Sequence, residues 1–212
     1  MYQLPCQNHF LSKIFYTKAL LLCVCVLAWM GVDAQTNENI LSFNEIRLER
    51  QKTGMWVLGA WALGNIGSGI ALSGQRDGSA KYFHQMNAGW NLVNLGIASV
   101  GYLAAVRTDP AAGGLYESIQ SQYQIQKILL LNTGLDVAYM AGGAYLIERS
   151  KNDRKNPDRL KGFGQSILLQ GGFLFVFDLA QYAWLASSNE TLKTLLGSMG
   201  PTSDGIGLTL RF

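Results

Sequence analysis

Cysteine is missing from all but the first part of this 212-residue sequence. The three cysteines, Cys6, Cys23 and Cys25, lie within the first 25 residues. If that part is removed from the mature protein, the remaining chain can form no disulfide, no thiolate metal site and no cysteine nucleophile.

Charge is also scarce, at 15% of the residues, whereas ordinary soluble domains contain about 25%. Hydrophobic residues make up 49% and there are 24 glycines, a composition that suits a helical bundle in lipid. The net charge of +3 is small, and no basic run is interleaved with aromatic residues. We therefore expect one domain, with the lipid bilayer as a partner and no binding to nucleic acid.

Motifs of catalysis and cofactor binding are absent from the sequence. HExxH, GxxxxGK[ST] and GxSxG do not occur. His84 is the only histidine after residue 34, and a lone histidine is more typical of an interfacial residue than of a metal ligand. We expect no enzyme activity, no metal and no cofactor.

Four long segments rich in apolar and small residues dominate the rest of the chain. As helices rising about 1.5 Å per residue, segments of 20 residues or more match the ~30 Å hydrocarbon core of a bilayer. None of the four prolines falls inside them. The sequence predicts an all-α, four-span transmembrane helix bundle, with spans at about 54–73, 86–106, 126–148 and 163–187. A soluble exported bundle is disfavoured because these segments lack a charged outer face.

Residues 1–34 have the pattern of a secretory signal peptide. Lys13 and Lys18 precede a twelve-residue apolar core at 19–30, and Val32-Asp33-Ala34 suits the cleavage positions. An uncleaved anchor helix is the alternative. Export predicts a membrane protein of the bacterial envelope, with the inner membrane favoured over the outer membrane.

The segments that flank the predicted spans are shorter. Residues 35–53 predict an amphipathic helix at the membrane interface, because Ile40, Phe43 and Ile46 are three apart. The alternative is that they form the exposed first turns of one long helix. Residues 188–212 predict a C-terminal tail that is extended, because apolar residues alternate from Ile206 to Phe212. One such strand cannot make an outer-membrane barrel.

The first span also carries a stripe of small residues on one helical face, at Ala60, Gly64, Gly67 and Ala71. Such a stripe predicts close approach of a neighbouring backbone.

The connection at 150–161 is the most basic part of the chain. From Glu148 onward it carries six basic residues with Arg149 included, against three acids. The positive-inside rule therefore predicts that this connection is cytoplasmic. Counting three crossings from an exported N-terminus gives the same orientation and places both mature termini outside.

Each predicted span has an Asn or Asp near its middle, followed by an aliphatic residue and then Gly or Ala. Four antiparallel helices crossing one bilayer would bring these groups to a similar depth. A carboxyl at the bilayer centre costs roughly 2.5–3.5 kcal/mol, so it is expected to face inward and to be paired, hydrated or protonated. With neighbours on the same faces, the predicted polar cluster consists of Asn65, Asn91, Asn94, Asn132, Asp136, Tyr139, Asp178 and Tyr182.

Two interpretations of this cluster remain open. It binds a small ligand or ion, or relays protons, or its members only join helices by hydrogen bonds worth under ~1 kcal/mol each. The absence of a Gly- or Pro-broken helix pair favours the second interpretation. We therefore expect a structural or interaction role, with a homo-oligomer or an envelope protein as partner. A small carrier or ligand- and proton-binding bundle is the alternative.

Three stretches carry a family resemblance: MNAGWNLVNLGIAS at 86–99, LLNTGLDVAYMAGG at 130–143 and QGGFLFVFDLAQYAW at 170–184. They resemble a family of small helical membrane proteins found mostly in Bacteroidota, to which no activity is assigned. The resemblance covers about residues 45–187. It implies a multi-span membrane protein from a bacterium with two membranes, and it implies no activity.

Overall fold

The structure is a computed structural model that describes residues 8–197, 201–202 and 205–206. It is helical apart from one antiparallel pair of two-residue strands. In chain order the elements are α1 (Asn8–Ser73), α2 (Gly78–Arg107), α3 (Leu115–Ser150), α4 (Pro157–Ala186), α5 (Asn189–Gly197), β1 (Pro201–Thr202) and β2 (Gly205–Ile206).

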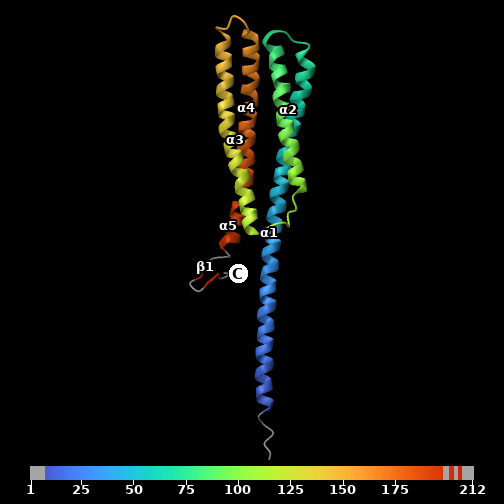
Figure 1. Cartoon of the computed structure of the whole chain (residues 1–212), viewed down its shortest axis with the longest axis vertical. Coiled ribbons are helices and arrows are strands. Elements are labelled where there is room, and N and C mark those ends of the chain that lie inside the picture. The colour runs from blue at the N-terminus through green and yellow to red at the C-terminus, as the bar shows by residue number, and fades with distance from the viewer. Residues whose placement is uncertain (1–7, 198–200, 203–204, 207–212) are drawn as a thin grey trace, which may run out of the picture.

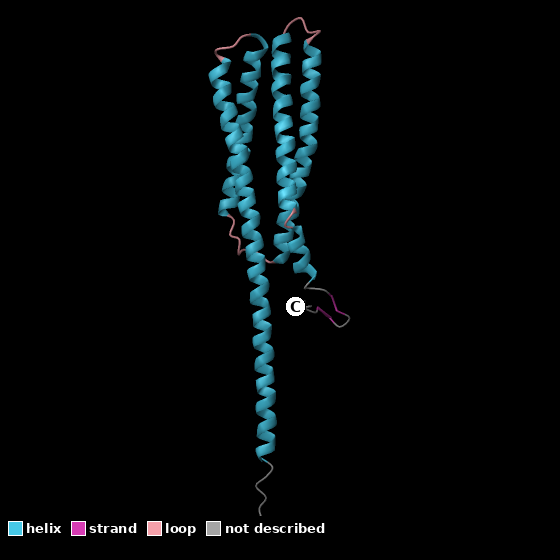
Figure 2. Cartoon of the chain, turned by 180° about the vertical axis from the view of Figure 1, so that it is seen from behind, coloured by secondary structure: helices cyan, strands magenta, loops and turns pink. Residues whose placement is uncertain are grey.

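The helices α1 to α4 form an elongated antiparallel bundle, and the N-terminal part of α1 projects beyond it (Figure 1). The bundle is built from two hairpins, α1 with α2 and α3 with α4, which are joined by packing of α2 on α4. The backbones of α2 and α3 hardly approach each other, although Trp90 of α2 and Tyr139 of α3 are in contact. The short connections within both hairpins lie at one end, and the connection from α2 to α3 lies at the other end, near α5 (Figures 1 and 2).

The helix ends follow local sequence signals. The helix α2 begins at Gly78, whose φ of +59° is in the left-handed region that favours glycine. The helix α4 begins at Pro157, a residue well suited to a first turn because its nitrogen has no hydrogen to leave unpaired. At the start of α3, the Gly114 N–H donates to Glu117 Oε2 over 2.9 Å.

The all-helical prediction is confirmed, and each predicted apolar segment lies within one of α1 to α4, except that the last one extends one residue beyond the end of α4 at Ala186. Among the described residues, three helical stretches are long and apolar enough to cross a membrane: Glu38–Ser73, Gly78–Arg107 and Pro157–Thr194. The helix α3 is not among them. Its polar and small residues, Asn132 and Asp136 included, lower its mean hydropathy.

Of the two interpretations of residues 35–53, the structure agrees with the alternative: they belong to one long helix and do not form a separate short one. The helix α1 runs through this segment without a break, because it contains neither glycine nor proline. Ile40 and Phe43 are buried against Leu192 of α5, and Leu115 and Ile119 of α3 pack on the same cluster. One face of the first turns of the bundle part of α1 is therefore covered by protein, while Ile46 on another face is 47% exposed.

The predicted extended tail also differs from the structure. Residues 189–197 form α5, because Leu192 packs into the cluster at the start of the bundle. Of the alternating apolar residues only Ile206 is described, in β2. Leu208, Leu210 and Phe212 lie outside the described residues.

Close backbone contacts occur at other glycines than the predicted stripe. A Cβ on Gly164 of α4 would lie 2.6 Å from the carbonyl oxygen of Gly143 on α3, and a Cβ on Gly143 would lie 2.8 Å from that of Gly164. By contrast, a Cβ on Gly64 or Gly67 would meet nothing within 4 Å. The prediction that this face of α1 packs closely on a neighbouring helix is therefore wrong within the chain.

The C-terminal end of α4 is bonded by an arginine from α1. Arg50 Nη1 donates to the Trp184 carbonyl oxygen (2.5 Å), to Ser187 Oγ (3.0 Å) and to Ser188 Oγ (2.6 Å). In return, Gln181 Nε2 donates to the Arg50 carbonyl oxygen over 2.9 Å. The Arg50 cation therefore bonds to the Trp184 carbonyl at the helix end and interacts favourably with the negative end of the helix dipole.

We expect Arg50→Ala to lower the free energy of unfolding by about 1 kcal/mol, since it removes bonds from a charged donor to this helix end. The unfolding midpoint of the detergent-solubilised protein measures the effect. Lys52→Ala is the control, because Lys52 pairs only with Glu49 of the same helix in the described part of the chain. Equal midpoints for the two variants would contradict a capping role for Arg50.

Candidate functional site

The bundle has a polar interior and an apolar surface. Among the residues whose burial is described, fourteen polar or charged side chains are buried and only ten hydrophobic ones. Large apolar side chains point outward instead: Val100 is 69% exposed, Leu131 65% and Val176 65%. This is the reverse of the arrangement in a water-soluble bundle.

One part of the interior is a network of hydrogen bonds between α1, α2 and α4, here called the amide network (Trp61, Asn65, Asn87, Ser166 and Gln170). Asn87 Oδ1 accepts from Ser166 Oγ over 2.5 Å and from Gln170 Nε2 over 3.1 Å. Gln170 Oε1 accepts from Trp61 Nε1 over 2.8 Å, and Gln170 Nε2 also donates to Asn65 Oδ1 over 3.3 Å. The network connects the two hairpins through their side chains.

The asparagines of α2 continue from this network along one face of the helix. Asn91 Nδ2 donates to the Asn87 carbonyl oxygen over 2.8 Å, and Asn94 Nδ2 donates to Asn91 Oδ1 over 3.2 Å. All three side chains are buried. The chain of amides therefore leads from the amide network to Asn94, which lines a cavity.

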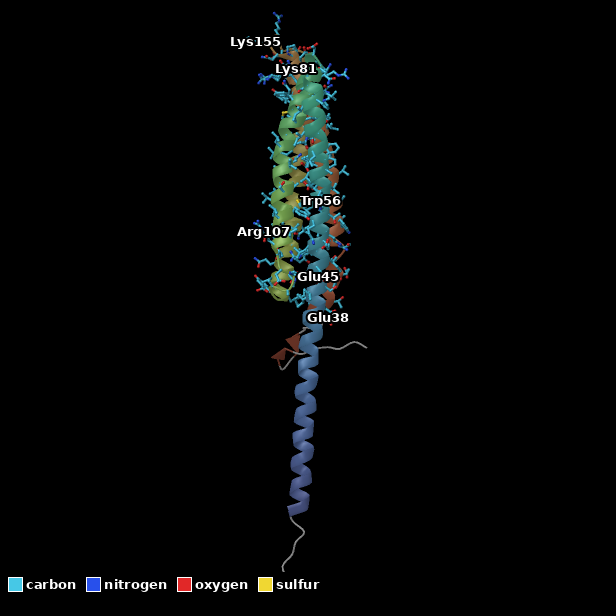
Figure 3. All side chains as sticks on the ribbon, turned by 90° about the vertical axis from the view of Figure 1, so that its right-hand side faces the viewer. Glu38, Glu45, Trp56, Lys81, Arg107 and Lys155 are labelled. Atoms are coloured by element: carbon cyan, nitrogen blue, oxygen red, sulfur yellow. The ribbon has the colours of Figure 1, made fainter. Side chains whose placement is uncertain are left out.

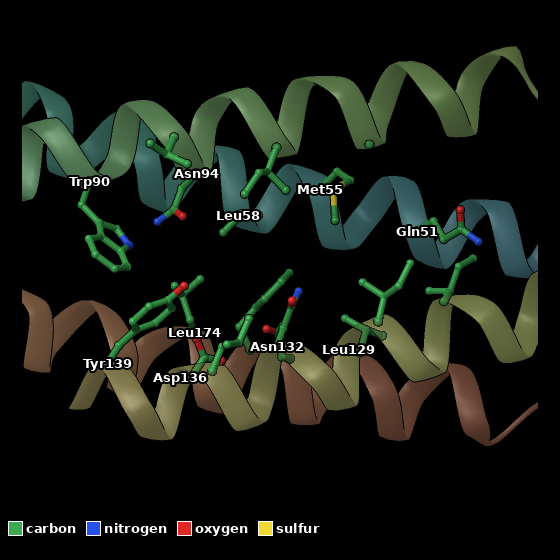
Figure 4. Close-up of a pocket in the computed structure, with 18 residues that line it drawn as sticks. Gln51, Met55, Leu58, Trp90, Asn94, Leu129, Asn132, Asp136, Tyr139 and Leu174 are labelled. Atoms are coloured by element: carbon green, nitrogen blue, oxygen red, sulfur yellow. The ribbon is translucent and has the colours of Figure 1, made fainter. Parts of the chain in front are cut away.

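This cavity, of about 450 Å³, lies between the two hairpins and is lined by all four long helices (Figure 4). Asn94 and Asn132 point into it from opposite sides, and the rings of Trp90 and Tyr139 meet at one end (Figure 4). Those rings are edge to face, with centroids 4.9 Å apart. Most of the wall is apolar, and its polar side chains are Gln51, Asn94, Asn132, Asp136, Tyr139 and Asp178.

Two acids, here called the carboxyl pair, lie at the wall of the cavity. Asp136 of α3 is 2% exposed and Asp178 of α4 is 5% exposed, and their side chains are within hydrogen-bonding reach of each other. Asp136 Oδ2 is buried and has no hydrogen-bond partner among the residues that the structure describes. No ion pair in the described part of the chain involves either acid. Two adjacent carboxyls in such surroundings require a shared proton or a cation.

The structure separates the predicted polar cluster into parts. Five of its eight members line the cavity: Asn94, Asn132, Asp136, Tyr139 and Asp178. Asn65 belongs to the amide network, Asn91 bonds within α2, and Tyr182 does not line the cavity. Of the Asn and Asp residues near the middles of the four predicted spans, Asn94, Asp136 and Asp178 therefore line one cavity, and Asn65 lies apart from them.

The sequence interpretation left out the residue that makes the most bonds in the amide network, Gln170. A signal for it was present, because Ser166, Gln170 and Asp178 are spaced four and eight residues apart and so share one face of a helix. Trp90, four residues before Asn94, was left out as well, because the cluster was built around the Asn and Asp residues and the tyrosines near the two acids.

Charged side chains form bands at the two ends of the bundle. Lys81 and Lys155 lie at one end, and Arg107, Glu45 and Glu38 toward the other (Figure 3). Between the bands, α1 and α2 carry no charged residue over 53–75 and 82–106, and only the carboxyl pair interrupts α3 and α4. These uncharged stretches are roughly 35 Å long as helices.

The band at the hairpin connections has an excess of positive charge. It contains eight basic and four acidic side chains, whereas the described residues of the opposite band, from Glu38 onward, contain six of each. The pKa of Asp153 in this band is held below its ordinary value by the backbone N–H groups of Asn156 and Lys155, so this acid is counted as charged. The positive members are Arg76, Lys81, Arg149, Lys151, Arg154, Lys155, Arg159 and Lys161.

Metal ligands do not gather in the described part of the chain: no group of three or more His, Cys, Asp or Glu side chains is placed to hold a metal ion.

Fold and interior together define a class, an all-helical protein with three helical stretches apolar enough to cross a membrane and a polar interior between two hairpins. The model of a family of unknown function, DUF6992, matches residues 57–179. Because the match covers more than half of the chain, the protein belongs to this family. The matched region includes the whole predicted polar cluster except Tyr182. No curated protein and no solved structure matches the chain.

Proposed function

We propose that this chain is an integral membrane protein with four spans whose interior cavity binds a small ligand. The observation that carries the proposal is the inverted burial pattern, with amides and acids inside and large aliphatic side chains outside. In water this arrangement would expose apolar surface around the whole bundle. In lipid it leaves apolar side chains in contact with acyl chains and lets the polar groups bond to one another.

The helix α3 is included as a span although its mean hydropathy is lower than that of its neighbours. Its polar groups are turned inward, since Asp136 is buried and Asn132 lines the cavity. Its outer face carries aliphatic side chains, with Leu131 65% and Val137 50% exposed. It also packs along α4, so it occupies the same depth as that helix.

The uneven charge of the two bands supports an orientation. The positive-inside rule places the band with the hairpin connections in the cytoplasm. Both mature termini are then outside, in agreement with a signal peptide at residues 1–34 and with a location in the inner membrane of the bacterial envelope.

A ligand-binding role is favoured by the difference in hydrogen bonding between the amide network and the carboxyl pair. The amide network satisfies its own members by hydrogen bonds between helices. The carboxyl pair is different, because it faces a cavity and leaves Asp136 Oδ2 unpaired. Of the described side chains that line the cavity, none is a histidine, lysine, serine or cysteine, so we propose binding and not catalysis.

The second candidate is a structural or interaction role in the envelope. It is favoured by the amide network, since three buried polar residues there act only in joining helices. On this reading the carboxyl pair would share a proton and the cavity would have no specific occupant.

Membrane insertion is tested with single cysteines in a chain whose Cys6, Cys23 and Cys25 are replaced by serine. Exposed Ala112, in the connection of α2 to α3, and exposed Lys155 report on the two ends, and Leu131 on the outer face. In cells whose outer membrane alone is permeabilised, we expect a membrane-impermeant maleimide to label Ala112→Cys. It should label Lys155→Cys only after the cells are lysed. Leu131→Cys should stay unlabelled until the protein is denatured.

The same membranes are treated with alkaline carbonate, which should leave the protein in the pellet. Release by carbonate together with rapid labelling of Leu131→Cys in water would contradict membrane insertion. Labelling of Lys155→Cys in unlysed cells would contradict the proposed orientation.

A further inference from the structure

The cavity is far larger than a bound ion would need. Its volume of about 450 Å³ lies within the range of roughly 300–1,000 Å³ that is usual for organic ligands. Leu58, Leu129 and Leu174 supply apolar surface, with Met55 and Phe177 beside them. An occupant that fits these walls has an apolar body.

The polar part of the cavity selects the head group of such an occupant. The carboxyl pair and the side-chain oxygens of Asn94, Asn132 and Tyr139 can all accept hydrogen bonds. No lysine or arginine is among the described lining residues, and no ion pair there neutralises the acids. The head group that complements these acceptors is therefore a cation that also donates hydrogen bonds.

A protonated amine has both properties. It carries one positive charge and N–H donors, and its bonds to carboxylates are stronger than those between neutral groups. Aromatic rings attract cations as well, and Trp90, Tyr139 and Phe177 line the same cavity.

The cavity opens between α2 and α3, whose backbones hardly approach each other and whose side chains Trp90 and Tyr139 meet at one end of it. Val93 and Ile97 of α2 line it and are 64% and 55% exposed. On the opposite side, Ile128 and Leu135 of α3 line it and are 50% and 44% exposed. This opening is apolar and lies in the uncharged part of the bundle, so in a bilayer it faces the acyl chains.

We propose that the cavity binds a small lipophilic amine that reaches it sideways from the membrane, with its ammonium on the carboxyl pair and its apolar body against the aliphatic wall. This inference rests on the proposed membrane insertion and ligand-binding role, and it specifies the class of ligand.

The test uses three probes with one rigid apolar body: 1-adamantylamine, 1-adamantanol and adamantane-1-carboxylate. At pH 7.5 the amine is a cation, as the lysine side chain is. Binding to the full chain in detergent or nanodiscs is measured by isothermal titration calorimetry. We expect the amine to bind at least tenfold more tightly than the alcohol, and the carboxylate to show no binding.

Variants then assign the discrimination to the carboxyl pair. Asp136→Asn with Asp178→Asn should reduce binding of the amine at least tenfold and leave the alcohol unchanged. Asp153→Asn is the matched control, because it removes an acid from an exposed connection. If the double variant does not fold, the comparison of amine with alcohol on the unaltered protein decides by itself.

Equal binding of amine and alcohol, or an unaltered amine affinity in a folded double variant, would overturn the inference. So would the absence of amine binding, which is the result expected if the carboxyl pair shares a proton. In each of these cases the carbonate and cysteine experiments still report on membrane insertion, so the two failures are distinguishable.

Discussion

Replacing Gly164 with alanine is expected to lower the free energy of unfolding by about 3 kcal/mol, near the upper end of the usual cost of overpacking. The new Cβ would lie 2.6 Å from the Gly143 carbonyl oxygen and 2.9 Å from the Ile147 nitrogen. Both are backbone atoms of α3, so no side-chain rotation can relieve the contact. The two helices have to move apart along the most extensively packed pair of the bundle.

The control is the same substitution at Gly67, which is exposed and would place its Cβ where nothing lies within 4 Å. Alanine is the better helix former by about 1 kcal/mol, so Gly67→Ala should be neutral or slightly stabilising. The midpoint of thermal unfolding in one detergent gives both effects, and only Gly164→Ala should lower it. A lower midpoint for Gly67→Ala would instead show that this face of α1 packs on another molecule.

Replacing Gln170 with leucine is expected to cost about 2 kcal/mol of stability. The change keeps the size of the side chain but removes its bonds to Trp61, Asn65 and Asn87. Each interhelical hydrogen bond is worth about 0.6 kcal/mol in a membrane protein, and the Trp61 N–H is left without its acceptor. Denaturant or thermal unfolding of the purified protein measures the loss.

Gln124→Leu is the matched control, since Gln124 is exposed on α3 and the same atoms are exchanged there. Its effect should stay within about 0.5 kcal/mol, as for most surface substitutions. If both variants unfolded at the same point, the amide network would have no part in holding the hairpins together.

Helix positions were predictable because charge and proline delimit them. Lys52 and Arg76 bound the uncharged part of α1, and Lys81 and Arg107 bound that of α2. The two acids at the centres of the remaining segments were also correctly placed in the interior, since a carboxyl facing lipid is unfavourable.

The errors have local causes. Residues 35–53 were assigned to an interfacial helix because of their amphipathic pattern, with the first turns of one long helix as the alternative. The absence of glycine and proline there favours the continuous helix. The helix α5 was not predicted, because residues 188–212 were all assigned to an extended tail on the alternation from Ile206 to Phe212. Its own signal was modest: Glu190 in the first turn, Leu192 and Leu196 four apart, and Gly197 at the end.

The cavity itself could not be predicted from the sequence. Helical spacing shows that Asn132, Asp136 and Tyr139 share a face, but not which helix that face meets. The gap depends on the backbone of α2 packing against α1 and α4 while it stays apart from that of α3. Which helices pack together depends on the fit of many side chains and on close contacts such as that of Gly143 with Gly164. No single residue pattern in the sequence predicts this arrangement.

The division into two hairpins bears on how the protein is assembled in a bilayer. Asp136 and Asp178 belong to the same hairpin, so each acid finds its partner as soon as α3 and α4 meet. If the chain inserts as proposed, a proton or cation held between the two acids would offset part of their unfavourable transfer within one inserting unit, before the earlier hairpin of α1 and α2 associates with it. The contacts left for that last association include the amide network, the bonds of Arg50 to the end of α4 and the far wall of the cavity. A ligand already held by the acids would therefore be enclosed as the two halves come together.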